Sequence, residues 1–353
     1  MKNYKNILIT GGAGFIGGAL IRKLLTDYES NIFNLDKMGY ASDLSGINSI
    51  KSSKASHQLF PINLVNRESI DAILNEINPD LIIHLAAESH VDRSIDNPSN
   101  FIESNIIGTF NLLESSRSYW NKLDSSKKEL FRFHHVSTDE VYGTLGKNGF
   151  FKESSNYSPR SPYSASKACS DHLVRSWHHT YGLPIVITNC SNNYGPYQFP
   201  EKLIPLTILK AINGQNIPLY GDGSNIRDWL YVDDHVDAII HAVKFAKTGE
   251  TYCIGGQATK TNFEVIEEIC SILDKIRPKQ FKHNSLIKFV PDRPGHDERY
   301  AIDISKIKTN LNWSPKYSFK SGLKKTVTWY LNNLNWCNNV LNKSGYRGNR
   351  IGL

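Results

Sequence analysis

A glycine-rich turn between a short apolar strand and a helix constrains the fold of this chain more than any other feature. Residues 6–10 have the composition of a buried strand, the sequence GGAGFIG occupies residues 11–17, and an apolar helix face begins at Ala19 and Leu20. Glycines at such a turn let the backbone approach a pyrophosphate, which the N-terminus of the helix then binds. The order of strand, turn and helix therefore predicts the first unit of a dinucleotide-binding α/β sheet.

An acidic residue at the end of the second strand indicates which dinucleotide binds. Residues 31–35 have the composition of a strand, and Asp36 follows it, nineteen residues after Gly17. A carboxylate at this place accepts hydrogen bonds from the adenosine ribose and repels a 2′-phosphate. We therefore expect NAD rather than NADP, although the positive charge of Lys37 weakens the repulsion.

Strands and helices alternate through the first half of the chain. The third strand is expected to end near residues 62–64, and the apolar run 81–87 is typical of a central strand covered on both faces. Helices are expected over residues 69–76 and 105–120, with a polar loop over residues 122–129. This alternation predicts a Rossmann-type, doubly wound parallel sheet.

A hydroxyl and two adjacent acids follow the strand expected at residues 131–136. They are Thr138, Asp139 and Glu140, and ligands of an open α/β sheet bind beyond the carboxyl ends of its strands. Taken alone, such a pair of acids is more often a solvated turn. In a closed site, however, the pKa values of two neighbouring acids are pushed apart, so that one donates a proton and the other accepts one.

The best-marked helix of the sequence carries a tyrosine and a lysine one turn apart. Ser161 suits its N-cap, Pro162 its first position, and Gly182 its end. Tyr163 and Lys167 then share one face, where an ammonium beside a phenol favours the phenolate and lowers the pKa of the tyrosine. After a glycine turn and an acid-bearing strand, this pair indicates general acid–base chemistry.

Two further expectations concern helix packing. Apolar residues recur every four positions at Ala165, Cys169, Leu173 and Trp177, and we expect this stripe to face the core. A final helix is expected over residues 321–334, followed by a polar segment that has the composition of an appendage.

The regular alternation ends near residue 190, and Asn, Gly, Pro and aromatic residues accumulate beyond it. We therefore divide the chain into an NAD-binding Rossmann domain at residues 1–190, to which later segments return, a loop-rich substrate lobe at residues 191–336 and a C-terminal tail at residues 337–353. Lys202, Arg227 and Arg293 in this lobe suit a diphosphate, because arginine offers a planar fork to phosphate oxygens and lysine a point charge. Taken singly, each is more often a surface charge.

The composition limits the classes of protein that remain. The 353 residues carry a net charge of +7 without a long basic block, which fits an anionic small molecule at least as well as nucleic acid. Five scattered cysteines indicate reduced thiols rather than disulfides or a zinc site. No apolar run approaches the ~20 residues of a membrane helix, and the first strand begins too early for a signal peptide. We expect a cytoplasmic protein with no metal and no nucleic-acid or membrane partner.

Together these motifs resemble those of the extended short-chain dehydrogenase/reductases, and among them the dTDP-glucose 4,6-dehydratases. The resemblance spans residues 5–336. The segments that carry it are 84–94, 137–143, 163–167, 189–205, 227–232 and 292–303. The Thr-Asp-Glu triplet is its most specific part, because sugar-nucleotide epimerases of the same fold usually lack the two acids.

The resemblance implies a hydro-lyase that works in three steps at one site. Tyr163, assisted by Thr138 and Lys167, takes the proton of the sugar 4-hydroxyl while hydride passes from C4 to NAD. Glu140 then removes the C5 proton and Asp139 protonates the departing 6-hydroxyl, so that water leaves. Hydride returns to C6, the product is a 4-keto-6-deoxy sugar nucleotide, and NAD stays bound through each turnover.

The site residues that the resemblance implies fall into three groups. The catalytic group is Thr138, Asp139, Glu140, Tyr163 and Lys167. The NAD contacts are Gly11, Gly14, Phe15, Ile16, Gly17, Asp36, Asn63, Leu64, Leu85, Ala86, Ala87, Ser89, Ser104, Tyr163, Lys167 and Asn193. The substrate contacts are Ser89, Thr138, Asn192, Lys202, Leu203, Pro218, Leu219, Tyr220, Arg227, Asn262, Asp292, Arg293 and His296. The resemblance also implies a homodimer that pairs through the helices at residues 105–120 and 163–181.

Four positions depart from the family's pattern. Asn63 stands where an aspartate usually meets the adenine, and we expect weaker binding there because only an amide oxygen remains to accept the exocyclic amine. Gly39 and Ser104 replace threonines near the cofactor, and Glu298 stands where an arginine is common beside the diphosphate loop. None of the four belongs to the proton-transfer group.

Two alternatives remain beside the dehydratase. A sugar-nucleotide 4-epimerase or decarboxylase shares the fold, but epimerisation at C4 needs no elimination pair. A non-catalytic NAD-binding sensor needs only the first half of the chain and has no use for Tyr163, Lys167 and Thr138 together. The thymidine base rests on the resemblance alone, so the preferred nucleotide and the deoxysugar pathway stay open.

Overall fold

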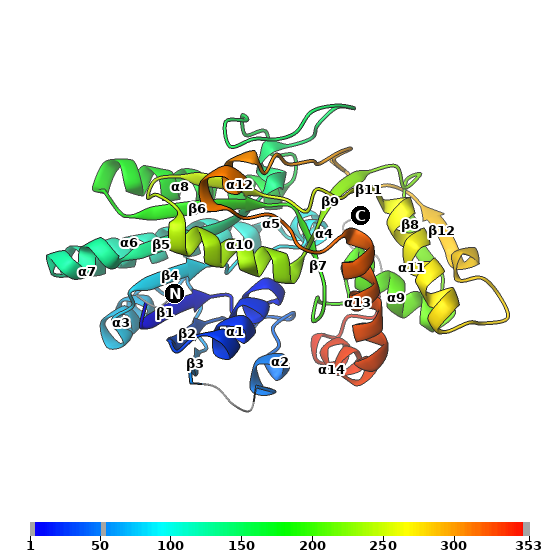
Figure 1. Cartoon of the computed structure of the whole chain (residues 1–353), viewed down its shortest axis with the longest axis horizontal. Coiled ribbons are helices and arrows are strands. Elements are labelled where there is room, and N and C mark those ends of the chain that lie inside the picture. Colours follow the sequence, from blue (N-terminus) through cyan, green and yellow to red (C-terminus); the bar gives the residue numbers. More distant parts are fainter. Residues whose placement is uncertain (1–3, 51–53, 349–353) are drawn as a thin grey trace.

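The computed structural model describes residues 4–50 and 54–348 and places a parallel sheet at the centre of the larger of two lobes (Figure 1). Within these residues the sheet has seven strands, each parallel to its neighbours. In order across the sheet they are β3 (Ser56–Phe60), β2 (Asn31–Leu35), β1 (Asn6–Thr10), β4 (Leu81–His84), β5 (Arg132–Thr138), β6 (Ile185–Cys190) and β10 (Thr251–Ile254). This order reverses direction between β1 and β4, as in dinucleotide-binding sheets, and confirms the predicted Rossmann-type fold.

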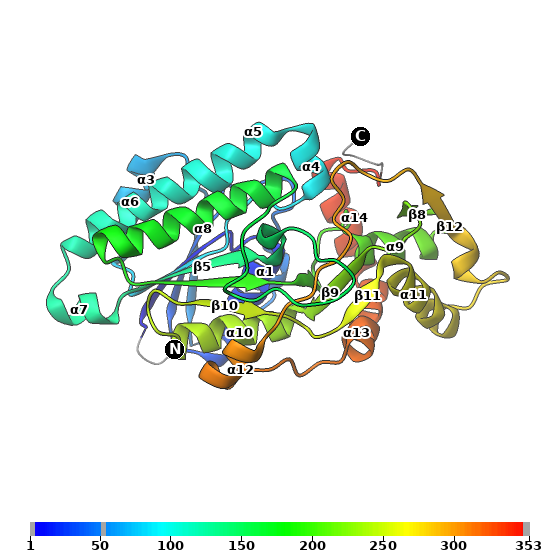
Figure 2. The ribbon, with the colours of Figure 1, turned by 90° about the horizontal axis from the view of Figure 1, so that it is seen from above.

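Helices cover both faces of this sheet, because successive side chains of a strand point to opposite sides. Ile7 and Ile9 of β1 belong to one buried apolar cluster, and Leu8 between them belongs to another. The helices on the first face are α1 (Phe15–Asp27) and α10 (Val232–Phe245), and those on the second are α3 (Arg67–Ile77), α6 (Gly108–Asn121) and α8 (Pro162–Tyr181) (Figure 2).

The smaller lobe has its own core, built on two small sheets. Their strands are β7 (Asn192–Tyr194), β9 (Ile226–Tyr231) and β11 (Thr259–Thr261) in one sheet, and β8 (Ile217–Tyr220) and β12 (Ile287–Val290) in the other. The helices of this lobe are α9 (Leu203–Ile212), α11 (Asn262–Ile276), α13 (Phe319–Asn332) and α14 (Leu334–Ser344). The lobe interrupts the Rossmann sheet, since the chain leaves after β6 and returns to add β10.

Short elements complete the part of the chain that the structure describes. They are α2 (Ser45–Asn48), α4 (Val91–Asp96), α5 (Pro98–Phe101), η1 (Ile102–Ile107), α7 (Ser125–Leu130), η2 (Asp139–Tyr142), η3 (His283–Leu286) and α12 (Ser305–Leu311). None of the helices in residues 4–50 and 54–348 combines the length and apolar composition that a membrane crossing requires.

Several predicted boundaries were wrong for local reasons. β3 ends at Phe60, two to four residues before the end predicted near residues 62–64. The predicted polar loop contains α7, whose N-terminus the Asp124 side chain caps. A π-helical segment, η1, leads directly into α6 where one uniform helix was expected. The helix expected at residues 321–334 is α13, and α14 follows it where the sequence suggested a tail; residues 349–353 of that tail lie outside the described residues.

The helix α8 buries a different stripe from the one predicted. Ser161, Pro162 and Gly182 delimit it as expected, with a reciprocal capping box between Ser161 and Ser164. The predicted apolar stripe is partly exposed, and Cys169 within it is exposed. Tyr163, Lys167 and their neighbours along the helix form the buried face instead. The small and polar residues of that face pack against the sheet, and their size leaves room for the site.

Candidate active site

All five predicted catalytic residues and every predicted NAD contact line one cleft at the carboxyl ends of the central strands. Among the predicted substrate contacts, Ser89, Thr138, Asn192 and Lys202 line the same cleft. The other predicted substrate contacts lie outside its lining, on the smaller lobe: Leu203, Pro218, Leu219, Tyr220, Arg227, Asn262, Asp292, Arg293 and His296. The structure therefore brings the catalytic group and the dinucleotide cradle together.

The glycine turn has the geometry of a pyrophosphate cradle. Gly11 adopts φ +72°, and a Cβ there would lie 2.7 Å from the backbone of Ala86. Gly14 is the N-cap of α1, and no side chain caps the first amides of the helix. Those amides are therefore left for an anion, which fits a dinucleotide pyrophosphate.

Asp36 stands at the ribose end of the cleft and is held by its own loop. Its Oδ2 accepts from the Ala13 amide at 3.0 Å, and its Oδ1 accepts from the Met38 amide at 2.8 Å and from the Ser42 hydroxyl at 3.0 Å. Lys37, which weakened the preference for NAD, forms an ion pair of 2.5 Å with Glu88. Its charge is thus largely neutralised, and Asp36 keeps its repulsion of a 2′-phosphate.

The positions that depart from the family's pattern near the cofactor remain compatible with it. Asn63 Oδ1 accepts from the Val65 amide at 3.2 Å and keeps a second lone pair toward the cleft that it lines. A Cβ on Gly39 would have only Lys37 Cε nearby, at 3.8 Å, so the missing side chain leaves space there. Ser104 lies in η1 and lines the cleft with its hydroxyl retained.

Tyr163 and Lys167 lie on the buried face of α8, close to the end of β5. Lys167 Nζ donates to the Val136 carbonyl at 3.0 Å and lies 3.5 Å from His135 Nε2. Burial lowers the pKa of Lys167, whereas the charge of Asp171 raises it. The ammonium is therefore fixed against strand β5 rather than free in solvent.

The sequence predicted a lowered pKa for Tyr163, and this prediction was wrong: the groups of the protein itself raise that pKa. Burial raises this pKa well above its ordinary value, the charge of Glu140 raises it further, and a hydrogen bond with Thr138 lowers it. The reason is geometric: Lys167 donates to the backbone of β5, and a carboxylate is the dominant charge that faces the phenol.

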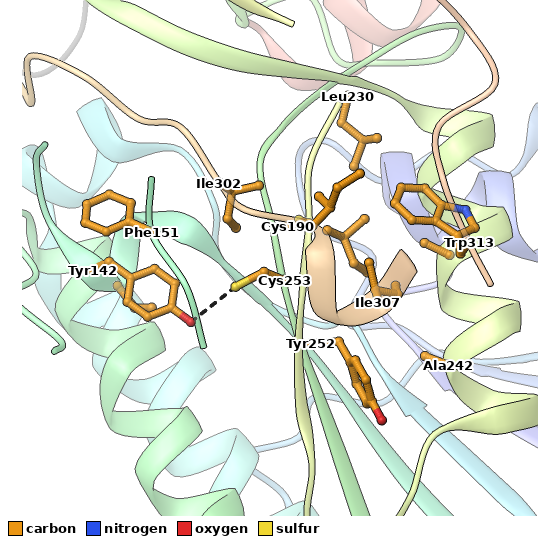
Figure 3. Packing of buried hydrophobic residues seen from close by; sticks show 14 of the residues in the cluster. Tyr142, Phe151, Cys190, Leu230, Ala242, Tyr252, Cys253, Ile302, Ile307 and Trp313 are labelled. Atoms are coloured by element: carbon orange, nitrogen blue, oxygen red, sulfur yellow. Dashed lines mark hydrogen bonds between the residues drawn. The ribbon is translucent and has the colours of Figure 1, made fainter. Parts of the chain in front are cut away.

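The acids Asp139 and Glu140 are fixed by the turn η2 that contains them. Val141 and Tyr142 of this turn are buried in an apolar cluster with β6, β10 and the segment around Ile302 (Figure 3). The Tyr142 hydroxyl also contacts Cys253 Sγ at 3.6 Å. Because Val141 and Tyr142 are packed in this core, the turn is held in place, and both of its acids line the cleft.

The environments of the two acids raise both of their pKa values, but more cations oppose the shift at Glu140. Burial and the charge of Glu140 raise the pKa of Asp139 well above its usual range, and its Oδ2 has no hydrogen-bond partner among the described residues. Burial also raises the pKa of Glu140, but the charges of Arg293, Lys202 and Arg227 oppose that shift. The surroundings of Asp139 thus favour its protonated form, and Glu140 is the more readily ionised of the two, as an acid–base pair requires.

The charged residues of the smaller lobe are held by partners that sequence reasoning missed. Arg293 forms an ion pair of 2.6 Å with Asp92, which also accepts from the Tyr220 hydroxyl at 3.1 Å. Arg227 donates to the Asp297 carbonyl at 2.9 Å. The Glu298 side chain is exposed, and the Glu298 carbonyl accepts from Arg227 Nη1 at 3.5 Å. No spacing in the sequence signals these long-range pairs.

A second missed group lies beneath Lys167. His135 and Asp171 are fully buried, and Asp171 lies one helical turn beyond Lys167. This i, i+4 spacing was the signal that could have identified it. Among the described residues, no cluster of three or more His, Cys, Asp or Glu side chains is arranged to hold a metal ion.

Comparison with known proteins agrees with this geometry. A family model described as GDP-mannose 4,6 dehydratase matches residues 8–326. A dTDP-glucose 4,6-dehydratase of Neisseria meningitidis serogroup B is 51% identical over 353 residues, covering 99% of each chain. The chain belongs to the dTDP-glucose 4,6-dehydratase family. The corresponding enzyme 1 of Escherichia coli K12 is also 51% identical, over 96% of both chains.

Solved structures of this dehydratase family share the whole fold. The enzyme of Bacillus anthracis, in complex with NAD, has a TM-score of 0.84 at 42% identity and covers 95% of this chain and 99% of its own. The enzyme of Streptomyces venezuelae, with NAD and TYD bound, has a TM-score of 0.86 at 40% identity with the same coverage. A UDP-glucose 4-epimerase of Thermus thermophilus has a TM-score of 0.80 at 26% identity. The fold is thus shared with epimerases, while the sequence favours the dehydratases.

Proposed function

We propose that this enzyme catalyses the NAD-dependent 4,6-dehydration of dTDP-glucose to dTDP-4-keto-6-deoxyglucose and water. The observation that carries the proposal is the position of Asp139 and Glu140 in the same cleft as Tyr163, Lys167 and the glycine turn. An epimerase has no need of this second acid–base pair. The dehydratase relatives at 51% identity support the same substrate and reaction.

The residues of the cradle fit NAD. The amides at the start of α1 would hold the pyrophosphate, and Asp36 would accept from the adenosine ribose. When bound, NAD supplies a reversible hydride acceptor. Phe15, Ile16 and the small residues Ala86 and Ala87 line the cleft and allow a flat ring system to lie close to the sheet.

Tyr163 takes the proton of the 4-hydroxyl as C4 becomes a ketone. Its phenol is buried beside Thr138, whose hydrogen bond favours the ionised form, and Lys167 is fixed one turn away on the same helix face. Burial and Glu140 oppose ionisation of the phenol, and the Thr138 hydrogen bond favours it; Lys167 would add its positive charge once its ammonium turns from the Val136 carbonyl toward the phenol.

Glu140 and Asp139 then divide the elimination between them. The new ketone acidifies the C5 hydrogen, and Glu140, ionised with the help of three nearby cations, removes that proton. Asp139, whose pKa burial raises, protonates the 6-hydroxyl so that it departs as water. The proton on Glu140 returns to C5 when C6 becomes a methyl group.

The proton balance assigns a further task to Thr138. The sugar loses its 4-hydroxyl proton to Tyr163 and loses hydroxide from C6 with a proton from Asp139. One turnover therefore leaves Tyr163 protonated and Asp139 ionised, and one proton must pass between them. The Thr138 hydroxyl hydrogen-bonds Tyr163 and lies 3.5 Å from Asp139 Oδ1, a position from which it can carry that proton.

The smaller lobe would bind the nucleotide. Lys202, Arg227 and Arg293 lie near Glu140 and would neutralise the diphosphate, while residues 218–220 would contact the base. Arg293 is positioned by Asp92, which links it to the Tyr220 hydroxyl. Diphosphate and base are thereby recognised by one connected group.

One assay tests the proposed reaction. The purified protein is incubated separately with dTDP-, UDP-, CDP- and GDP-glucose, and the alkali-induced absorbance of a 4-keto sugar is recorded. We expect the signal to be strongest with dTDP-glucose. A 4-epimer without a 4-keto product would favour the epimerase, and no product with any substrate would favour an NAD-binding sensor.

We also propose a homodimer that pairs through α6 and α8. These helices lie side by side, with the Phe110 and Trp177 rings 5.8 Å apart (Figure 2). Ile107, just before α6, and Tyr181 at the end of α8 are among the exposed large apolar side chains. The partly exposed apolar stripe of α8 fits the same role, because a second copy would cover it.

A cytoplasmic location is part of the proposal. All five cysteines are free, and four of them are buried, which suits a reducing compartment. Separation of the cell into fractions, with activity measured in each, tests this location.

A further inference from the structure

Side chains outside the Rossmann lobe form hydrogen bonds with the loop that follows Asp36. Residues 37–44, here called the cofactor loop, connect β2 to α2, and Tyr40 and Ser42 in it line the cleft. The Asp43 amide donates to the Ala13 carbonyl at 2.8 Å, and the Ser42 hydroxyl donates to Asp36 at 3.0 Å. The cofactor loop thus connects the ribose carboxylate to the glycine turn.

The C-terminal helix α14 contacts this loop twice. Trp336 Nε1 donates to Asp43 Oδ2 at 2.9 Å, and Lys343 Nζ donates to the Ser42 carbonyl at 3.1 Å. In Figure 1 α14 lies beside the α2 end of the loop. Two consecutive loop residues are therefore fixed by two side chains that are separated by about two turns of one helix.

The helix α14 itself packs against the core of the smaller lobe. Cys337 and Val340 are buried, Cys337 within the core of that lobe. The Trp336 ring packs against Trp329 at 5.1 Å and Tyr197 at 5.5 Å between ring centroids. The ring is thus fixed before it contacts Asp43, and the loop cannot move outward without breaking contacts between the lobes.

A third contact comes from the segment before α9. The Tyr40 hydroxyl donates to Glu201 Oε1 at 2.6 Å, and the Tyr40 ring meets Phe199 edge to face at 5.4 Å. Glu201 is buried and also accepts from Arg93 Nε at 2.9 Å. Tyr40, Ser42 and Asp43 of the cofactor loop are therefore all held by residues that lie beyond residue 190.

We propose that α14 is a latch on the cofactor loop, in which Trp336 and Lys343 hold Ser42 and Asp43 against the glycine turn and so keep NAD bound between turnovers. This inference rests on the proposed function, because that reaction regenerates NAD and gives it no reason to leave. Trp336 and Lys343 touch neither the substrate nor the reacting atoms, and they are positioning residues. Their effect is on the rate at which the adenosine end of the site opens.

The test measures NAD release rather than activity. Holoenzyme is diluted, released NAD is removed by rapid filtration at successive times, and retained NAD is extracted and quantified. For Trp336→Phe, which keeps an aromatic ring and removes the donor, we expect release about tenfold faster, the factor that matches loss of one hydrogen bond to a charged acceptor. Lys343→Ala, a change at an exposed residue that leaves folding intact, should accelerate release about threefold.

A matched tryptophan provides the control. Trp313 is buried in another apolar cluster, and its Nε1 has no hydrogen-bond partner among the described residues. Trp313→Phe should release NAD at the wild-type rate. Asp43→Asn keeps an oxygen that accepts from Trp336, so it should release NAD more slowly than Asp43→Ala, and adding Trp336→Phe to Asp43→Ala should change little.

Each outcome decides for or against the latch. Release at the wild-type rate from both Trp336→Phe and Lys343→Ala would overturn it and leave the proposed function standing. A wild-type protein that loses its NAD during one desalting step, yet dehydrates dTDP-glucose with added NAD, would overturn the latch alone. A protein that neither retains NAD nor responds to it would overturn the cofactor assignment itself.

Discussion

Asp171 Oδ1 lies 3.1 Å from His135 Nε2, and the same nitrogen lies 3.5 Å from Lys167 Nζ. Burial pushes the pKa of Asp171 upward, but hydrogen bonding with His135 and the charge of Lys167 lower it to about 2. Burial and the charge of Lys167 lower the pKa of His135 to about 4, so the histidine is neutral at working pH. The buried carboxylate thus offsets the effect of burial on the pKa of the Lys167 ammonium across an uncharged ring.

The first prediction concerns Asp171→Asn, which removes this charge with little change of shape. Because Asp171 raises the pKa of Lys167, its neutralisation should lower that pKa and move the alkaline limb of kcat down by about one pH unit. The kcat at neutral pH should fall about tenfold. The measurement is a pH profile of kcat on enzyme with its NAD content determined.

Other groups that face this cluster define the control. They are Tyr157 and Arg175 near α8, Cys190 on β6, and His84 on β4, whose ring lies 5.2 Å from that of His135. Tyr157→Phe removes a hydrogen bond of 2.6 Å to Asp171 but no charge. It should leave the alkaline limb close to its wild-type position, and a matching profile for Asp171→Asn would refute the electrostatic role.

The second prediction separates oxidation from elimination. Glu140→Gln keeps the size of the side chain and removes the base, so NAD binding and oxidation at C4 should persist while loss of water stops. Turnover should fall about 10²- to 10⁴-fold, the usual contribution of a general base. Stopped-flow absorbance should show reduced nicotinamide that forms and then persists. Unchanged turnover would rule Glu140 out as the base.

The third prediction concerns the acid limb of the pH profile. Burial raises the pKa of Glu140, so activity should disappear as pH falls through a value above that of an ordinary glutamate. Arg293 favours the ionised form of Glu140, and Arg293→Ala should therefore move the acid limb to higher pH by about half a unit and raise KM about tenfold. Arg293→Lys keeps the charge and should therefore restore the position of the acid limb. It should restore the KM less, because a lysine cannot form the paired hydrogen bonds that an arginine makes with phosphate.

Local signals account for what the sequence predicted well. The glycine turn, the strand-end carboxylate Asp36 and the capped start of α8 at Ser161 each involve residues that are close in the chain. Short motifs therefore specify the backbone conformations that these features need. The parallel sheet followed from the alternation of apolar runs, because each buried strand must be covered by a helix before the next begins.

Contacts between distant residues explain what the sequence did not predict. Arg293 and Asp92 are 201 positions apart, and Tyr40 and Glu201 are 161 apart, so no spacing links them. The helix α14 was missed because asparagines separate its few apolar residues. The direction of the Tyr163 pKa depended on where Lys167 donates its hydrogen bond, which the i, i+4 spacing does not determine.

The fourth prediction is a loss of stability in mild acid. Burial lowers the pKa of His134 and of His235 to about 3, so the folded chain stays unprotonated at these sites while the unfolded chain binds protons near pH 6.5. The free energy of unfolding should therefore decline as pH falls from about 6.5 toward about 3. His134→Asn should make this decline shallower by about 1.4 kcal/mol per pH unit, whereas a change at the exposed His172 should not. Urea unfolding at a series of pH values measures the slope.

The fifth prediction tests the dimer. Ile107 is 41% exposed just before α6, and a carboxylate placed there would have to lose its water in the proposed interface. Ile107→Asp should convert the protein to monomers at micromolar concentration, because desolvation of an unpaired charge costs several kcal/mol. Phe289 on β12 is the control, since it is 62% exposed and belongs to the other lobe. Light scattering should show a dimer for wild type and for Phe289→Asp and a monomer for Ile107→Asp; a dimer in all three would exclude this face as the interface.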